Sequence, residues 1–218
     1  MVDLNESEAY GIDLKIILIG NASTGKTSIV DRYINNVFRD QKKATISPDF
    51  SYKLIKKNGI IYRLQFWDIP GQDRSPALTS VFCHDAHGFL FVCNCLVEKT
   101  RKDIINWKKS LSDFIDISNL PGIIMENKCD LLGEEKDYEK GIEELKSFSE
   151  ENNFYGAFRT SALNGYNVEN GINFLVDEII RKINTEEKNN INNDISNKKE
   201  EVKKVKLTDK NEKSNKCC

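Results

Sequence analysis

The sequence predicts an α/β fold, a doubly wound sheet that is mostly parallel and has one antiparallel strand. Apolar runs at residues 14–19 and 88–94 lack the polar alternation of a half-exposed strand, which indicates strands covered on both faces. Amphipathic helical patterns separate most of the strand-like runs, as parallel strands require. Asn58-Gly59 stands between two further strand-like runs and predicts one β-hairpin, which supplies the antiparallel strand.

The remaining elements follow in chain order. The predicted strands cover residues 14–19, 50–57, 60–67, 88–94, 123–125 and 156–159. The predicted helices cover residues 26–36, 100–115, 136–152 and 168–182. The second of these helices carries Ile104, Trp107, Leu111 and Phe114 at helical spacing, and we interpret this stripe as core rather than as a cofactor site.

Composition limits the classes of protein to consider. A chain of 218 residues has room for one domain of typical size plus a tail, and its net charge of −2 indicates no general affinity for nucleic acid. No stretch approaches the roughly 18 apolar residues of a membrane-spanning helix, and residues 1–10 are acidic rather than signal-like. The six cysteines form no Cys-x-x-Cys pair, so neither a disulfide scaffold nor a zinc site is indicated, and a reducing, cytosolic compartment fits.

Residues 20–27 read Gly-Asn-Ala-Ser-Thr-Gly-Lys-Thr and match the phosphate-loop pattern Gly-x-x-x-x-Gly-Lys-[Ser/Thr]. A predicted strand enters the segment and a predicted helix leaves it, whereas a chance surface turn needs neither. Such a loop points backbone N–H groups and the positive end of a helix dipole at one anion. Lys26 adds charge for the β- and γ-phosphates, and the Thr27 hydroxyl can bind Mg²⁺. The sequence therefore predicts a nucleotide site.

Three other segments follow predicted strands and belong to the same reasoning. Asp68 ends the second hairpin strand, where a carboxylate can hold Mg²⁺ through water, and Gly71 can bring its N–H to a γ-phosphate. An Asp-x-x-Gly segment alone is a common turn, but this one follows a phosphate loop by about 40 residues. Residues 127–130 (Asn-Lys-Cys-Asp) and 160–163 (Thr-Ser-Ala-Leu) come directly after the last two predicted strands.

The character of the chain changes beyond about residue 184. Residues 185–216 are rich in Asn, Lys and Glu and have no aromatic residue, so we expect disorder. Residues 198–216 hold eight lysines against four acidic residues, a local net charge of +4. Cys217 and Cys218 follow and are suited to lipid attachment, since one lipid holds weakly and two hold stably. The alternative is a pair of exposed free thiols.

Together these motifs resemble a small GTPase of the Ras superfamily over residues 12–183. The motifs that carry the resemblance are Gly-x4-Gly-Lys-Thr, Thr45, Asp68-x-x-Gly71-Gln72, Asn127-Lys-x-Asp130 and Ser161-Ala162. The aromatic residues Phe50, Trp67 and Phe82 and the Cys-Cys ending are most similar to the Rab family. Residues 63–69 (Arg-Leu-Gln-Phe-Trp-Asp-Ile) are similar to the Rab branch linked to lysosome-related organelles.

The resemblance implies a P-loop NTPase G domain with a six-stranded, mostly parallel sheet, one antiparallel strand and helices on both faces. An N-terminal extension (1–11) would precede it, and a disordered hypervariable tail (184–218) with the prenylation site at Cys217 and Cys218 would follow it. The implied function is a GTP/GDP switch with bound Mg²⁺ that hydrolyses GTP slowly without a GTPase-activating protein and regulates vesicle or organelle traffic.

The resemblance also assigns roles to residues. The implied nucleotide-binding residues are Ser23, Thr24, Gly25, Lys26, Thr27, Ser28, Phe38, Thr45, Gly71, Asn127, Lys128, Asp130, Ser161, Ala162 and Leu163. The implied metal ligands are Thr27, Thr45 and, through water, Asp68; the implied catalytic residues are Gln72, Lys26 and Thr45. Asp130 would accept hydrogen bonds from guanine, and Asn127 with the Ala162 N–H would reach N7 and O6.

Residues 37–49 and 69–83 would be two switch segments that the γ-phosphate orders. The implied partners are an exchange factor, a GTPase-activating protein, a Rab escort protein or GDP dissociation inhibitor, and switch-binding effectors. The protein would be a monomer without a nucleic-acid partner, bound through prenyl groups to the cytoplasmic face of an endosomal, lysosome-related or Golgi membrane and cycling with the cytosol. The three aromatic residues would form a partner site if exposed, and would merely pack if buried.

Several residues depart from the family pattern. Ser23 and Thr24 replace the usual Gly and Val of the phosphate loop, and Pro70 replaces an Ala. These departures leave a second hypothesis open, in which the chain is a nucleotide-bound scaffold that recruits effectors and scarcely hydrolyses GTP. A third, a phosphate-loop metabolic kinase, lacks a lid or acceptor site in the sequence and is disfavoured by the guanine motif.

Overall fold

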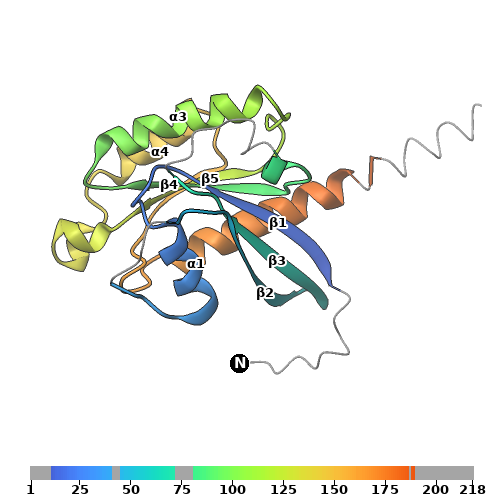
Figure 1. The fold of residues 1–218 in the computed structure, drawn as a ribbon, viewed down its shortest axis with the longest axis horizontal. Coiled ribbons are helices and arrows are strands. Elements are labelled where there is room, and N and C mark those ends of the chain that lie inside the picture. Colours follow the sequence, from blue (N-terminus) through green and yellow to red (C-terminus); the bar gives the residue numbers. More distant parts are fainter. Residues whose placement is uncertain (1–10, 41–44, 72–80, 187, 190–218) are drawn as a thin grey trace, which may run out of the picture. The chain divides into compact units, whose positions relative to one another are not determined.

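The computed structural model describes residues 11–40, 45–71, 81–186, 188 and 189 (Figure 1). The chain divides into two compact units, residues 1–179 and 180–218, and each is considered by itself. The predicted N-terminal extension, except Gly11, and residues 190–218 of the predicted tail lie outside the described residues.

The first unit contains a six-stranded sheet in the order β2-β3-β1-β4-β5-β6. The sheet comprises β1 (Ile12–Ile19), β2 (Asp49–Lys57), β3 (Ile60–Asp68), β4 (Gly88–Asn94), β5 (Gly122–Asn127) and β6 (Gly156–Arg159). β2 is antiparallel to β3 and all other neighbours are parallel, so the predicted fold class is confirmed. Asn58 and Gly59 both adopt positive φ, at 51° and 81°, as the predicted hairpin turn requires.

Helices cover both faces of this sheet (Figure 1). The helices are α1 (Lys26–Asn35), α3 (Glu98–Ser112), α4 (Ile142–Glu151) and a closing helix over residues 168–186, of which residues 168–179 belong to the first unit. Ile104 and Trp107 of α3 and Leu145 of α4 join a buried cluster with Ile17 and Phe91 of the central strands. On the other face, buried side chains of α1 and of residues 168–179 cover the sheet.

Three helix predictions are corrected. The helix predicted from residue 136 begins only at Ile142, because residues 135–137 form a 3₁₀ turn and Gly141 takes φ 74°, which a helix interior does not allow. Phe114 is not core: α3 ends at Ser112, and Phe114 is 51% exposed. The closing helix continues past the predicted end at 182, and within the second unit the Thr185 hydroxyl donates to Arg181 O at 2.8 Å. Residues 184–186, 188 and 189, which the sequence analysis assigned to the tail, are helical.

The topology places the predicted site. In a parallel sheet the carboxyl ends of the strands meet at one edge, and ligands bind in the crevice there. The segments that follow β1, β3, β5 and β6 begin at residues 20, 69, 128 and 160, and together with the strand-end residues Asp68 and Asn127 they carry the four predicted motifs. No helix among the described parts of the chain combines the length and the apolar character of a bilayer span.

Candidate functional site

A cavity of about 480 Å³ opens where these four segments meet the chain after α1. Its walls are formed by Ala22, Ser23, Gly25, Lys26, Thr27, Ser28, Phe38, Arg39, Asp40, Thr45, Gly71, Asn127, Lys128, Asp130, Leu131, Ala162 and Leu163. The structure thus brings together residues that are up to about 140 positions apart in the sequence. A volume of this size lies within the roughly 300–1,000 Å³ of small-molecule sites.

The backbone conformation of the phosphate loop requires glycine at two positions. Gly20 has φ 146°, and a Cβ there would lie 2.1 Å from the carbonyl oxygen of Val92 on β4. Gly25 has φ 97°, and a Cβ there would lie 2.2 Å from Nδ2 of Asn127. Both the backbone conformation and the close contacts exclude a side chain at these two positions. α1 begins at Lys26, so its N-terminus completes an anion-binding cradle.

Lys26 is folded over this loop. Its Nζ donates to Gly20 O at 2.9 Å and to Asn21 O at 3.2 Å, and the side chain is 6% exposed. Burial lowers the pKa of Lys26, and the Asp68 carboxylate opposes that shift. A buried ammonium that already faces backbone carbonyls can also bind phosphate oxygens as a point charge.

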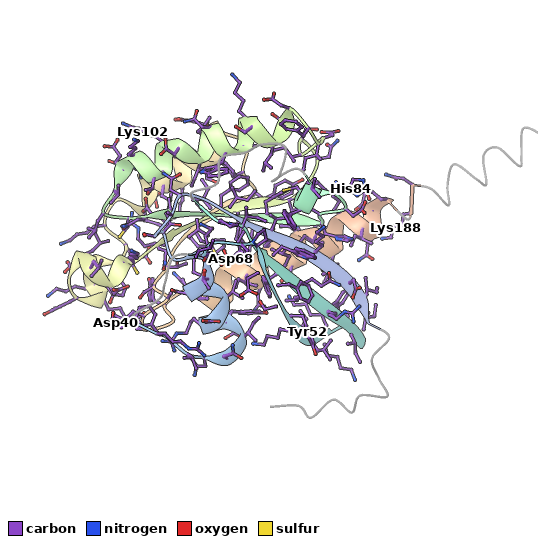
Figure 2. All side chains as sticks on the ribbon, in the orientation of Figure 1. Asp40, Tyr52, Asp68, His84, Lys102 and Lys188 are labelled. Atoms are coloured by element: carbon purple, nitrogen blue, oxygen red, sulfur yellow. The ribbon has the colours of Figure 1, made fainter. Side chains whose placement is uncertain are left out.

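The predicted metal ligands lie together. The Thr27 and Thr45 hydroxyl oxygens are 3.0 Å apart, and the Thr27 hydroxyl also donates to the Asp68 carboxylate. Asp68 ends β3 inside the fold, as Figure 2 shows, and is 4% exposed. Two hydroxyls and a carboxylate are hard oxygen donors of the kind that Mg²⁺ prefers, so these residues fit the ion.

Asn127 ties three of the segments together. It ends β5 and is 1% exposed; its Nδ2 donates to Thr24 O at 2.9 Å, and its Oδ1 accepts the Ala162 N–H at 3.0 Å. The Asn127 amide and the Ala162 N–H, which the resemblance assigns to the guanine base, therefore bond to each other here. Asp130 is half-buried, faces the cavity and accepts a hydrogen bond from the Ser161 hydroxyl.

Two predicted binding residues do not line the cavity. Thr24 and Ser161 are fully buried behind its wall, where the Thr24 hydroxyl donates to Asn21 O at 2.9 Å. Gln72 lies outside the described residues, as do residues 41–44 and 73–80 of the two switch segments and the lipidation candidates Cys217 and Cys218.

Sequence reasoning missed four lining residues, namely Ala22, Arg39, Asp40 and Leu131. Arg39 and Asp40 follow Phe38, and Leu131 follows Asp130, so chain adjacency was the available signal. Figure 2 shows Asp40 at the surface beyond α1.

The departures from the family pattern also have a structural setting. Ser23 adopts φ 61°, a left-handed conformation that disfavours a non-glycine residue. Pro70 is buried, and a Cβ on the neighbouring Gly71 would lie 2.3 Å from the Ala22 backbone nitrogen. The segment after β3 therefore lies directly against the phosphate loop.

The three aromatic residues form one cluster of mixed exposure. The ring centroids of Phe50 and Trp67 are 5.2 Å apart, and those of Trp67 and Phe82 are 6.0 Å apart. Trp67 and Phe82 pack against the core below, whereas Phe50 is 47% exposed. The cluster is thus neither fully exposed nor fully buried.

Comparison with known proteins gives a family match and several relatives. The model of the Ras family matches residues 15–183. Human "Ras-related protein Rab-32" is 32% identical over 208 residues, which cover 94% of this chain and 88% of that protein. "Ras-related protein Rab-32C" of Dictyostelium discoideum is 35% identical, with 81% of this chain and 77% of that protein covered. Human "Ras-related protein Rab-7L1" is 30% identical, with 77% and 82% covered.

Proposed function

The chain belongs to the Rab small GTPases of the Ras family, on the branch of its Rab-32 and Rab-7L1 relatives, and we propose that it is a GTP/GDP switch regulating vesicle or organelle traffic. One observation carries the proposal: a single cavity is lined by residues of the phosphate loop together with Thr45, Gly71, Asn127, Lys128, Asp130 and Ala162. A chance match of any one motif does not explain this convergence.

In the proposed mechanism the phosphate loop and Lys26 hold the β- and γ-phosphates of GTP. Thr27 and Thr45 would bind Mg²⁺ directly and Asp68 through water, and the ion would neutralise charge on the phosphates. Gln72 would orient the attacking water. Since phosphoryl transfer depends on positioning and charge stabilisation, these residues need no covalent chemistry.

Guanine would be selected by Asp130, whose carboxylate matches the paired N1–H and amine donors of that base. Adenine lacks this donor pair, so the partly desolvated carboxylate would be left unmatched. Asn127 and the Ala162 N–H would reach N7 and O6 of the base, and the hydrogen bonds of Asn127 to Thr24 and Ala162 would fix the segments around it. Phe38 and Lys128 also line the cavity and would flank the ring faces.

Partner binding would follow the nucleotide state. The segments 37–49 and 69–83 are the proposed switches for effectors, exchange factor and GTPase-activating protein, and the exposed Phe50 ring beside them supports an effector surface. Prenyl groups on Cys217 and Cys218 would hold the protein on the cytoplasmic face of an endomembrane, with a Rab escort protein or GDP dissociation inhibitor carrying it through the cytosol.

The scaffold hypothesis keeps a specific support, the buried Pro70 next to Gly71. Proline fixes φ and lacks an N–H, so it restricts the segment that must move when the γ-phosphate binds. Single-turnover hydrolysis of GTP by the purified full chain, with and without a GTPase-activating protein, distinguishes the switch hypothesis from the scaffold hypothesis. A switch releases phosphate slowly alone and faster with the activating protein, and Gln72→Ala abolishes the acceleration. Phosphate release no faster than in buffer under both conditions would favour the scaffold.

A further inference from the structure

A cluster of three charged side chains lies behind the base-facing wall of the cavity. Glu126 of β5 and Arg159 of β6 are 3% and 5% exposed, and they are register partners in the sheet. Arg159 Nη2 lies 2.7 Å from Glu126 Oε2, and Arg101 Nη1 of α3 lies 3.6 Å from Glu126 Oε1. None of the three lines the cavity, so none is a nucleotide contact.

The ion pair of Glu126 and Arg159 lies next in sequence to the two segments that face the base. Glu126 immediately precedes Asn127, and Arg159 immediately precedes the segment 160–163. The two backbones are joined at the same level, since Thr160 N donates to Glu126 O at 2.9 Å and Cys129 N donates to Thr160 O at 3.1 Å. The ion pair therefore lies where the two base-facing segments leave the sheet.

Arg159 also reaches a third segment. Its Nη1 donates to Lys140 O at 2.6 Å and to Tyr138 O at 3.3 Å, in the turns that precede α4. The Tyr138 hydroxyl in turn accepts from Asn164 Nδ2 at 3.2 Å, just beyond the segment 160–163. A shift of Arg159 would therefore displace residues on both sides of the segment 160–163, which carries Ala162.

Stability alone is a weak explanation for this pair. Burying two charges is costly, and well-packed apolar residues of similar volume often stabilise a protein as well or better. The short contact also lacks hydrogen-bond geometry, because Glu126 Oε2 and Arg159 Nε have no hydrogen-bond partner among the residues that the structure describes. What an ion pair adds over an apolar contact is an electrostatic attraction between two particular groups, here one near the end of β5 and one at the end of β6.

We propose that Glu126 and Arg159 are positioning residues that set the separation between Asp130 and the Ser161–Ala162 segment, and so the selectivity and lifetime of the bound guanine nucleotide. The inference rests on the proposed function, because it presumes that a guanine base occupies the cavity. Asp130 is tied to Ser161 across this separation, so a small displacement of β6 moves the carboxylate relative to the base.

The test compares the dissociation of GDP and of inosine diphosphate, which lacks the exocyclic amine of guanine. Loosening of the whole fold shortens the lifetimes of both bound nucleotides alike. Misplacement of Asp130 shortens the GDP lifetime more, and so lowers the ratio of the GDP lifetime to the inosine diphosphate lifetime. The full chain with Mg²⁺ is studied as wild type, as Glu126→Gln and as the apolar pair Glu126→Leu/Arg159→Met. Asp13→Asn is the matched control, since it breaks the ion pair of Asp13 with Arg63, which joins β1 to β3 and has half-exposed partners.

We expect wild type and Asp13→Asn to hold GDP longer than inosine diphosphate, with the same ratio of lifetimes. Glu126→Gln and the apolar pair should lower that ratio at least threefold, and the apolar pair should do so with a melting temperature close to wild type. If Glu126→Gln does not fold, the apolar pair alone decides. An unchanged ratio in a folded variant overturns the inference and leaves the proposed function intact. A wild type that binds neither nucleotide overturns both.

Discussion

Asn127→Ala should destabilise the domain itself, and not only weaken its hold on the nucleotide. Asn127 is 1% exposed and makes two hydrogen bonds, one to Thr24 O at 2.9 Å and one from the Ala162 N–H at 3.0 Å. The substitution leaves both backbone groups buried without that partner. Since each such group costs about 1–3 kcal/mol, the expected loss for the two groups is about 2–6 kcal/mol in the free energy of unfolding.

A loss of that size is easily measured. For a domain of 150–250 residues, a loss of 1 kcal/mol lowers the melting temperature by about 2–4 °C, so Asn127→Ala should lower it by roughly 4–24 °C. Bound GDP adds stability that grows with its concentration and depends on its affinity. Thermal unfolding over a series of GDP concentrations therefore separates the intrinsic loss from the loss of ligand binding.

Asp130→Ala is the matched control within the same motif. Asp130 is half-buried and faces the cavity, so its removal should weaken GDP binding. Because it leaves one buried group, the Ser161 hydroxyl, without its acceptor, the intrinsic loss should be about 1–3 kcal/mol, smaller than that of Asn127→Ala. The reasoning is refuted if the two variants show the same intrinsic loss. It is also refuted if the deficit of Asn127→Ala disappears on extrapolation to zero GDP.

Four further predictions concern the nucleotide cycle and the membrane anchor. Asp130→Asn should shift preference toward xanthine nucleotides, whose exocyclic oxygen suits an amide donor, and competition between GDP and xanthosine diphosphate measures this. Pro70→Ala should raise the rate of GTP hydrolysis by freeing the segment before Gly71, and Ser23→Gly should slow nucleotide dissociation by removing strain of roughly 1–2 kcal/mol at φ 61°. Rates that both stay within about twofold of wild type would contradict this pair of predictions. Intact mass of the protein from its own cells should show two prenyl additions at Cys217 and Cys218, and unmodified thiols on membrane-bound protein would argue for recruitment by a partner.

The sheet was predictable because short local sequence patterns identify its strands. Unbroken apolar runs such as residues 14–19 and 88–94 need cover on both faces, and the Asn58-Gly59 turn sets the antiparallel register of β2 and β3. The start of α4 was not predictable in this way. The charged pattern from residue 136 is helical in period, and only the backbone at Gly141 shows that the helix begins after it.

The candidate site likewise has features that the local sequence predicts and features that it does not. Lys26, Thr27 and Asp130 could be identified from motif spacing, because the chemistry of phosphate and base demands those residue types at those places. The bonds of Asn127 to Thr24 and Ala162 could not, since they join residues 103 and 35 positions apart. The pairing of Glu126 with Arg159 depends likewise on the register of β5 and β6, which no local pattern reveals.

The central claim is that the cavity selects guanine nucleotides, and the most direct test is competition of GTP and ATP against a fluorescent GDP analogue on the full chain with Mg²⁺. Losing both hydrogen bonds to the Asp130 carboxylate should cost several kcal/mol, which corresponds to a factor of roughly a thousand or more in affinity. The account predicts that GTP displaces the analogue at least about a thousandfold more effectively than ATP. Equal displacement by GTP and ATP would contradict it.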